Sequence, residues 1–173
     1  MPLSSSSSEA SNVCWQHAQQ GRLKCNIDAS FSQEWNGTGI GICVRDDDGA
    51  TVLAKSMSFS PLCHVFVGEA LGLFYALDWL SDIQMDNVDF VVDSKTTSDA
   101  FHSNRSDVSE FGHIITVQKL FTFQFTNSRV EFNRRQANEV AHALAREAVL
   151  SPSPTIYFNI PQSMNNIIIN KML

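Results

Sequence analysis

The spacing of apolar residues changes from period two to helical period near residue 60, and this change limits the possible folds more than any other feature. Residues 23–31 alternate apolar and polar side chains, as a half-buried β-strand does, and further strands are expected at 39–45 and 51–57. Residues 46–49, Asp-Asp-Asp-Gly, are typical of a hairpin turn because Asp and Gly tolerate a positive φ. The short connections predict an antiparallel meander of these strands.

Helical spacing follows the meander. Apolar residues recur with helical period over 67–80, and Gly68, Gly72 and Ala76 form a row of small residues that lets a helix approach a sheet closely. Further along, we expect a buried strand at 88–92, helices at 96–103 and 108–121, a β-prone segment at 123–132 and a last helix from about 137 to 150. This order predicts an α/β fold with a mixed five-stranded sheet flanked by helices, in which strands four and five run parallel to strand one.

Length and composition fit one domain with short tails. The chain has 173 residues, 43% of them hydrophobic, and its 12 Phe and 3 Trp argue against a disordered acidic protein. We expect a flexible Ser-rich leader at 1–13 and an ordered domain at 15–150. The tail at 151–173 is apolar enough to pack on the domain, and the alternative for it is an aggregation liability.

The same data bear on location and partners. No apolar run reaches the roughly 20 residues that cross a bilayer, so no membrane association is expected. The compartment stays open, with an intracellular, nuclear or cytoplasmic location favoured, and we expect a monomer with free thiols at its 4 Cys. A formal charge of -6 disfavours a protein whose affinity for nucleic acid comes from neutralising many phosphates. It is compatible with a cluster of carboxylates that holds cations.

Three acidic residues stand where secondary structure alone does not require them. Asp28 interrupts a strand, Glu69 lies early in a helix, and Asp93 ends a buried apolar strand. Taken singly, Asp28 could be a solvent-facing residue, Glu69 could complement the helix dipole, and Asp93 could cap the helix that follows. If the strands of Asp28 and Asp93 are neighbours, however, the two carboxylates lie about 4.8 Å apart, and cations are needed to offset the repulsion. Two hard ions such as Mg²⁺ or Mn²⁺ could then support phosphodiester cleavage.

Five short motifs occur in order along the chain: Cys25-Asn26-Ile27-Asp28-Ala29-Ser30, Gly39-Ile40-Gly41, Gly68-Glu69-Ala70, Val92-Asp93-Ser94 and Arg135-x-x-Asn138-x-x-Ala141-His142-x-Leu144-Ala145. Together they resemble the ribonuclease H-type domain and, more narrowly, its reverse-transcriptase-like branch, which is common in plant genomes and often derived from non-LTR retroelements. The resemblance covers roughly residues 15–150. It implies a ribonuclease H-like fold and endonucleolytic hydrolysis of the RNA strand of RNA–DNA hybrids.

The resemblance also implies cofactor and catalytic residues. Asp28, Glu69 and Asp93 match the first three catalytic acids of the family, which implies that they hold up to two Mg²⁺ or Mn²⁺ ions. The fourth acidic position carries His142, which takes that catalytic and metal-binding place here. An imidazole removes one negative charge and suits Mn²⁺ or Zn²⁺ better than Mg²⁺, so a weaker second metal site is expected. Glu139 could partly substitute, and the alternative for His142 is an ordinary surface histidine.

Candidate substrate contacts are polar residues near these acids. They are Ser30, Asn36, Ser94, Arg135 and Asn138, since hybrids are recognised through phosphates, 2′-hydroxyls and backbone shape. A solvated loop position is the alternative for each. The sequence has no long basic helix between Asp93 and Arg129, and near Phe132 and Asn133 it lacks the histidine that many active members carry before the last helix. A catalytically weakened or inactive domain that binds nucleic acid or a protein therefore remains the alternative to a nuclease.

Overall fold

The computed structural model describes residues 16–133, 139–151, 153–160 and 166 of the chain. The predictions for the leader at 1–13 and for Arg135 and Asn138 lie outside these residues. The elements are, in order, β1 (Leu23–Ser32), β2 (Gly37–Arg45), β3 (Thr51–Phe59), α1 (Val65–Asp82), β4 (Val88–Val92), α2 (Lys95–His102), α3 (Glu110–Phe121), η1 (Thr122–Gln124), β5 (Arg129–Phe132), α4 (Glu139–Leu150) and β6 (Thr155–Ile160).

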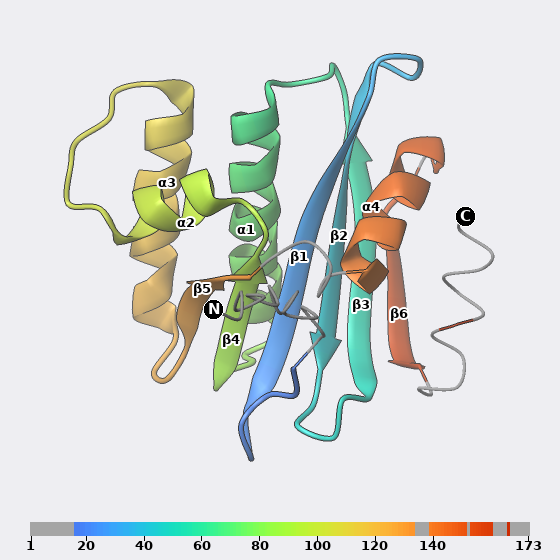
Figure 1. The fold of residues 1–173 in the computed structure, drawn as a ribbon, viewed down its shortest axis with the longest axis vertical. Coiled ribbons are helices and arrows are strands. Elements are labelled where there is room, and N and C mark those ends of the chain that lie inside the picture. Colours follow the sequence, from blue (N-terminus) through green and yellow to red (C-terminus); the bar gives the residue numbers. More distant parts are fainter. Residues whose placement is uncertain (1–15, 134–138, 152, 161–165, 167–173) are drawn as a thin grey trace, which may run out of the picture.

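The strands form one mixed sheet in the order β5-β4-β1-β2-β3-β6 (Figure 1). β1, β2 and β3 are an antiparallel meander, β4 runs parallel to β1, and β5 runs parallel to β4. The predicted α/β class, the meander and the direction of the fourth and fifth strands are therefore confirmed. Among the described residues, none of the helices is long and apolar enough to span a bilayer.

The sheet has one strand more than the sequence pattern predicts. β6 pairs antiparallel with β3, with Tyr157 opposite Ala54, and covers an edge that would otherwise present unpaired backbone groups. Its residues, Thr-Ile-Tyr-Phe-Asn-Ile, are β-branched or aromatic at most positions and favour a strand. The segment is short and mostly apolar, so the spacing of its apolar residues cannot distinguish a strand from an irregular tail packed on the domain.

The β-prone segment at 123–132 forms a strand only over its last four residues, so this part of the prediction is wrong. Thr122–Gln124 continues α3 as a 3₁₀ turn, and the chain then reverses at 126–128. The Asp86 carboxylate accepts hydrogen bonds from the backbone N–H groups of Thr126 and Asn127, which fixes this turn. The ring of Phe125 packs edge-on against Phe90, 5.3 Å between centroids, so the aromatic residues fill the core from a turn.

α1 and α4 lie on opposite faces of the sheet (Figure 1), and each covers an apolar cluster. On one face, α1 packs on β1 and β2 through residues such as Ile27, Ile40 and Leu73. On the other face, α4 packs on β2 and β3 through residues such as Cys43, Ala54 and Leu144. Because side chains alternate along a strand, Asp28 belongs to the α4 face although its neighbour Ile27 belongs to the α1 face.

Small residues set how closely α1 approaches the sheet. A Cβ on Gly68 would overlap the ring of Phe31, and a Cβ on Gly72 would lie 3.1 Å from Cγ2 of Ile27. The row of small residues in α1 therefore has the packing role that the sequence indicates. The described cysteines, Cys25, Cys43 and Cys63, are free thiols, as expected.

Candidate functional site

The carboxylates of Asp28, Glu69 and Asp93 converge on one spot. One oxygen from each residue can be chosen so that all of them lie within 4.8 Å of one another. Asp28 is only 1% exposed, whereas Glu69 and Asp93 are partly exposed. A buried carboxylate with two partly exposed ones beside it forms a cluster of negative charge that solvent can reach.

The parallel pairing of β1 and β4 brings two of these acids together. Ile27 lies opposite Val92 in the ladder, so the next residues along the two strands are Asp28 and Asp93. β4 ends at this point, while β1 continues to Ser32. The Asp28 carboxylate is fixed locally, because its Oδ1 accepts a hydrogen bond of 2.9 Å from the N–H of Ala29.

Glu69 reaches the same spot from the early turns of α1. The close contact of Gly68 with Phe31 holds this end of the helix against β1, beyond the end of β4. The buried side chain of Gln118 in α3 donates to the carbonyl of Ala70, the residue after Glu69. The helix turn that carries Glu69 is therefore fixed from the sheet side and from α3.

His142 enters the cluster from α4. Its Nδ1 lies 2.5 Å from Oδ2 of Asp28, and its side chain is 29% exposed. The structure thus places the imidazole beside the acids, at the position expected from the sequence motif. With an imidazole in place of a fourth carboxylate, the site has one negative charge fewer than a four-acid cluster would have.

Two glycines of β2 allow α4 to place His142 there. A Cβ on Gly39 would overlap the carbonyl of Ala145, and a Cβ on Gly41 would overlap the carbonyl of Ala141. Gly41 is paired with Asp28 in the β1–β2 ladder, so the helix backbone rests on the strand next to Asp28. The sequence motif contains Gly39 and Gly41, but the packing role of these glycines needs the helix position, which no local pattern gives.

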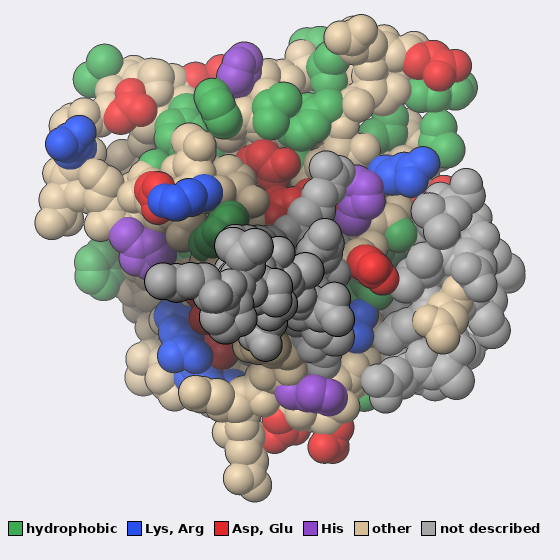
Figure 2. Space-filling view, in the orientation of Figure 1, with side chains coloured by type: hydrophobic (Ala, Val, Ile, Leu, Met, Phe, Trp, Pro, Cys, Tyr) green, Lys and Arg blue, Asp and Glu red, His purple; other side chains and the backbone are tan. Residues whose placement is uncertain are grey.

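The donor set fits a hard divalent cation. Three carboxylates within 4.8 Å repel one another, and a cation between them removes that repulsion. Carboxylate oxygens are the ligands that Mg²⁺ and Mn²⁺ prefer, and the imidazole of His142 adds a nitrogen donor that Mn²⁺ accepts more readily than Mg²⁺. Figure 2 shows acidic side chains near the middle of this face, while Lys and Arg side chains are scattered around it.

The predicted substrate contacts differ in position. Ser30 follows Asp28 by two residues on the same face of β1, and Ser94 directly follows Asp93. Ser94 caps α2, since its hydroxyl oxygen accepts from the N–H of Thr97 at 3.1 Å. Asn36 lies in the β1–β2 turn with a φ of 43°, and its side chain accepts from the N–H of Leu62. Ser30 and Ser94 are thus near the acids, and Asn36 has a structural contact of its own.

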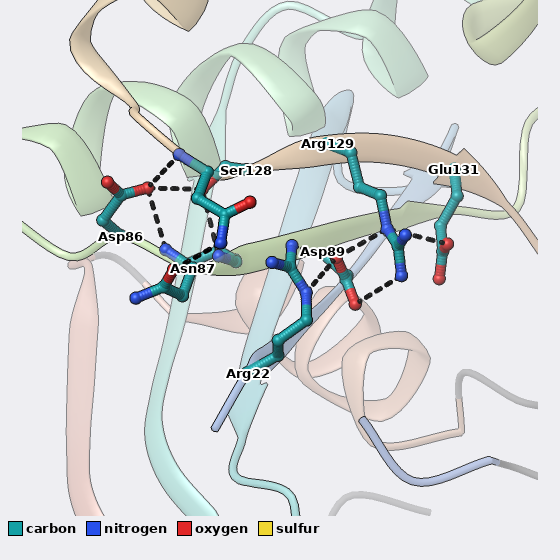
Figure 3. A network of polar contacts seen from close by, with 9 residues as sticks. Arg22, Asp86, Asn87, Asp89, Ser128, Arg129 and Glu131 are labelled. Atoms are coloured by element: carbon teal, nitrogen blue, oxygen red, sulfur yellow. Dashed lines mark hydrogen bonds and ion pairs between the residues drawn. The ribbon is translucent and has the colours of Figure 1, made fainter. Parts of the chain in front are cut away.

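A second polar network links β4 to β5 (Figure 3). Asp89, level with Lys24 in the ladder, pairs with Arg22 at 2.5 Å and with Arg129 at 2.8 Å. Burial alone would raise the pKa of the Asp89 carboxyl, but hydrogen bonds and charge from the two arginines outweigh burial and lower it. The pKa of Asp86 is also lowered, against its burial, by the N–H groups that it accepts from. These acids tie β4 to β5 and stand apart from the cluster at Asp28.

The fold and the acidic cluster define a ribonuclease H-like domain. The sequence model of the reverse transcriptase-like family matches residues 26–148, well over half of the chain, and the chain belongs to that family. No curated protein matches the chain.

Solved structures of low sequence identity share the fold. RNase H1 from the archaeon Halobacterium salinarum is 20% identical with a TM-score of 0.65, over 75% of this chain and 98% of that one. The N-terminal RNase H domain of Rv2228c from Mycobacterium tuberculosis is 19% identical with a TM-score of 0.63, and the match covers 74% of this chain and 93% of that one. LC11-RNase H1, solved in complex with an RNA/DNA hybrid, is 18% identical with a TM-score of 0.65, over 75% and 100%.

Proposed function

We propose that this domain binds RNA–DNA hybrids and hydrolyses the RNA strand internally with Mg²⁺ or Mn²⁺. The observation that carries the proposal is the convergence of Asp28, Glu69 and Asp93 within 4.8 Å, at the end of β4 in a ribonuclease H-like fold. The hybrid bound to LC11-RNase H1, which shares the fold, supports the choice of substrate.

Each residue of the cluster has a distinct task in this proposal. Asp28, buried and oriented by the N–H of Ala29, is the central ligand, and Glu69 and Asp93 complete the ligand set from the accessible side. Bound ions would activate a water and offset the charge of the scissile phosphate. His142 holds Oδ2 of Asp28 and limits the negative charge that an incoming phosphate meets.

Substrate contacts extend the proposal beyond the cluster. Ser30 and Ser94 flank the acids and are suited to phosphate oxygens or 2′-hydroxyls. Asn36, Arg135 and Asn138 are proposed as outer contacts, with Arg135 meeting a phosphate. The few basic residues near the site favour weak binding, in which the ions supply much of the attraction for the backbone.

The test is cleavage of a hybrid whose RNA strand carries a fluorescent label, in Mg²⁺ and in Mn²⁺. The Asp28→Asn variant keeps the shape of the side chain and removes its charge, and we expect cleavage to fall at least about a hundredfold. The matched control is Asp99→Asn on α2, an exposed acid that pairs with Lys95 and should cleave like wild type. Equal cleavage by wild type and Asp28→Asn would rule out this site.

One observation favours a second function. The contact of His142 with Asp28 leaves the cluster one carboxylate short of the four-acid set, which suits a domain that retains binding and has lost catalysis. In that case, gel-shift assays would detect hybrid binding, while neither metal would support cleavage by the wild-type chain. Cleavage that Asp28→Asn abolishes would exclude this alternative.

A further inference from the structure

A cavity of about 350 Å³ lies between the C-terminal ends of α2 and α3 and the edge strand β5. Its apolar lining comes from four different elements and one turn: Leu77, Phe90, Phe101, Phe125 and Val130. None of Asp28, Glu69, Asp93 and His142 lines it. Phe90 and Val130 belong to the apolar cluster on the α1 face, whereas Asp28 and His142 meet on the α4 face.

The shape and lining of the cavity suit a small aromatic molecule. Its volume is at the small end of ligand pockets, which span about 300–1,000 Å³. Three of its apolar residues are phenylalanines, and Phe90 and Phe125 already meet edge-on. Aromatic rings pack favourably edge-on or offset against such a lining, so a flat ligand of two or three rings gains contact with several rings at once.

The charge at the cavity has one sign. Its charged lining residues are Lys119 and Arg129, and none of the described lining residues is an Asp or Glu. The guanidinium of Arg129 is already paired with Asp89, so its charge is offset. The Lys119 ammonium donates to the carbonyl of Ser103, which lines a second cavity that shares Lys119 and contains Asp107. Because an ammonium carries three N–H donors, it can also bind an anion at the border of the two cavities.

We propose that this cavity binds a small aromatic molecule that carries one anionic group, with the rings among Phe90, Phe101 and Phe125 and the anion at Lys119. The Ser128 and Thr122 hydroxyls beside the cavity donate to Asp86 and to the carbonyl of Lys119. These hydroxyls already have acceptors, which leaves Lys119 as the group that selects an anion over a neutral ring. The ligand class follows from the lining alone and is independent of the proposed nuclease function.

The experiment compares two fluorescent probes of nearly equal shape: anilinonaphthalene sulfonate, which is an aromatic anion, and phenylnaphthylamine, which lacks the charge. The folded wild-type chain should bind the anion saturably at one site. Lys119→Gln should weaken the anion about five- to tenfold, the effect of losing a charged contact, and change the neutral probe less than twofold. Lys95→Gln, an exposed lysine at the start of α2, should change neither affinity.

A second variant and an NMR measurement test whether the probe binds in this cavity. Thr122→Trp fills the cavity from its half-buried rim, and it should abolish binding of both probes while circular dichroism shows an unchanged fold. In amide NMR spectra of the wild-type chain, the anion should shift Phe90, Phe101 and Val130 first. Non-saturable binding, equal affinity of wild type and Lys119→Gln for the anion, or shifts confined to other surfaces would each overturn the proposal.

Discussion

At the residue scale, the contact between His142 and Asp28 matters most for the acidic cluster. Its Nδ1 is 2.5 Å from Oδ2 of Asp28, so any change of this side chain acts directly on the most buried of the acids. A fourth carboxylate in its place would add an oxygen ligand and a negative charge, both of which favour Mg²⁺.

We therefore predict that His142→Asp binds Mg²⁺ about tenfold more tightly than wild type, the effect of one added charge at ligand distance. The variant should also lower the ratio of Mn²⁺-supported to Mg²⁺-supported cleavage. Isothermal titration with Mg²⁺ measures the first effect, and hybrid cleavage in each metal measures the second. An unchanged Mg²⁺ affinity would show that His142 lies outside the ligand set.

Asp89 gives a second prediction at the residue scale, on the dependence of stability on pH. Its pKa is lowered in the folded state because Arg22 and Arg129 favour the charged carboxylate, despite its burial. An unfolded Asp takes up its proton near pH 3.9, so this stabilisation is complete above about pH 4 and is lost as pH falls through the lower folded-state pKa.

Urea unfolding from pH 7 down to about pH 2.5 measures this loss, with Asp89→Asn as the comparison. The variant should be less stable by about 2 kcal/mol at pH 7, because it leaves two arginines without their carboxylate. The difference between wild type and variant should shrink as the pH falls below about 4. A difference that stays constant with pH would assign the effect of the substitution to packing.

Among the contacts between elements, the close packing of α4 on β2 matters most for the position of His142. A Cβ on Gly41 would lie 2.6 Å from the backbone N of Ala145 and would overlap the carbonyl of Ala141. A backbone cannot yield as a flexible side chain can, so any larger residue at 41 must lift the helix and His142 with it.

Gly41→Ala should therefore destabilise the fold by about 2–3 kcal/mol, as overpacked cores do, and reduce hybrid cleavage. Gly37→Ala in the same strand is the control, since its Cβ would meet no atom closer than 3.6 Å. Urea unfolding of both variants should separate them clearly. Equal stability of the two would mean that α4 sits farther from β2 than the structure shows.

The sixth strand offers a prediction from two adjacent residues. Tyr157 packs against the cluster of Cys43, Ala54, Val140, Ala141 and Leu144, whereas Phe158 is 71% exposed. Tyr157→Ala should cost about 2–3 kcal/mol and Phe158→Ala less than about 0.5 kcal/mol. Thermal or urea unfolding of both variants measures the difference. A larger loss of stability for Phe158→Ala would show that Phe158, and not Tyr157, faces the core.

At the scale of the whole molecule, the order of elements follows from the sequence because period-two and helical spacing are strong in this chain. The acids Asp28 and Asp93 are also predictable as a pair, since β1 and β4 are parallel neighbours and these acids follow the paired residues Ile27 and Val92. β6 could not be predicted as a strand because it is short and its polar and apolar residues do not alternate regularly. The turn at 126–128 could not be predicted because it is fixed by Asp86, 40 residues away. The role of Gly41 depends on where α4 rests, which is a tertiary property.

The proposed activity depends on Asp28, Glu69 and Asp93 holding divalent cations together. Paramagnetic broadening of amide NMR signals by substoichiometric Mn²⁺ tests it directly, because the effect falls steeply with distance from the ion. We predict that the signals of Ala29, Glu69 and Ser94 broaden first and that they remain sharp in the Asp28→Asn variant. Broadening that begins instead at the acidic turn Asp46-Asp47-Asp48, with no effect at these positions, would show that the three acids do not bind the ion.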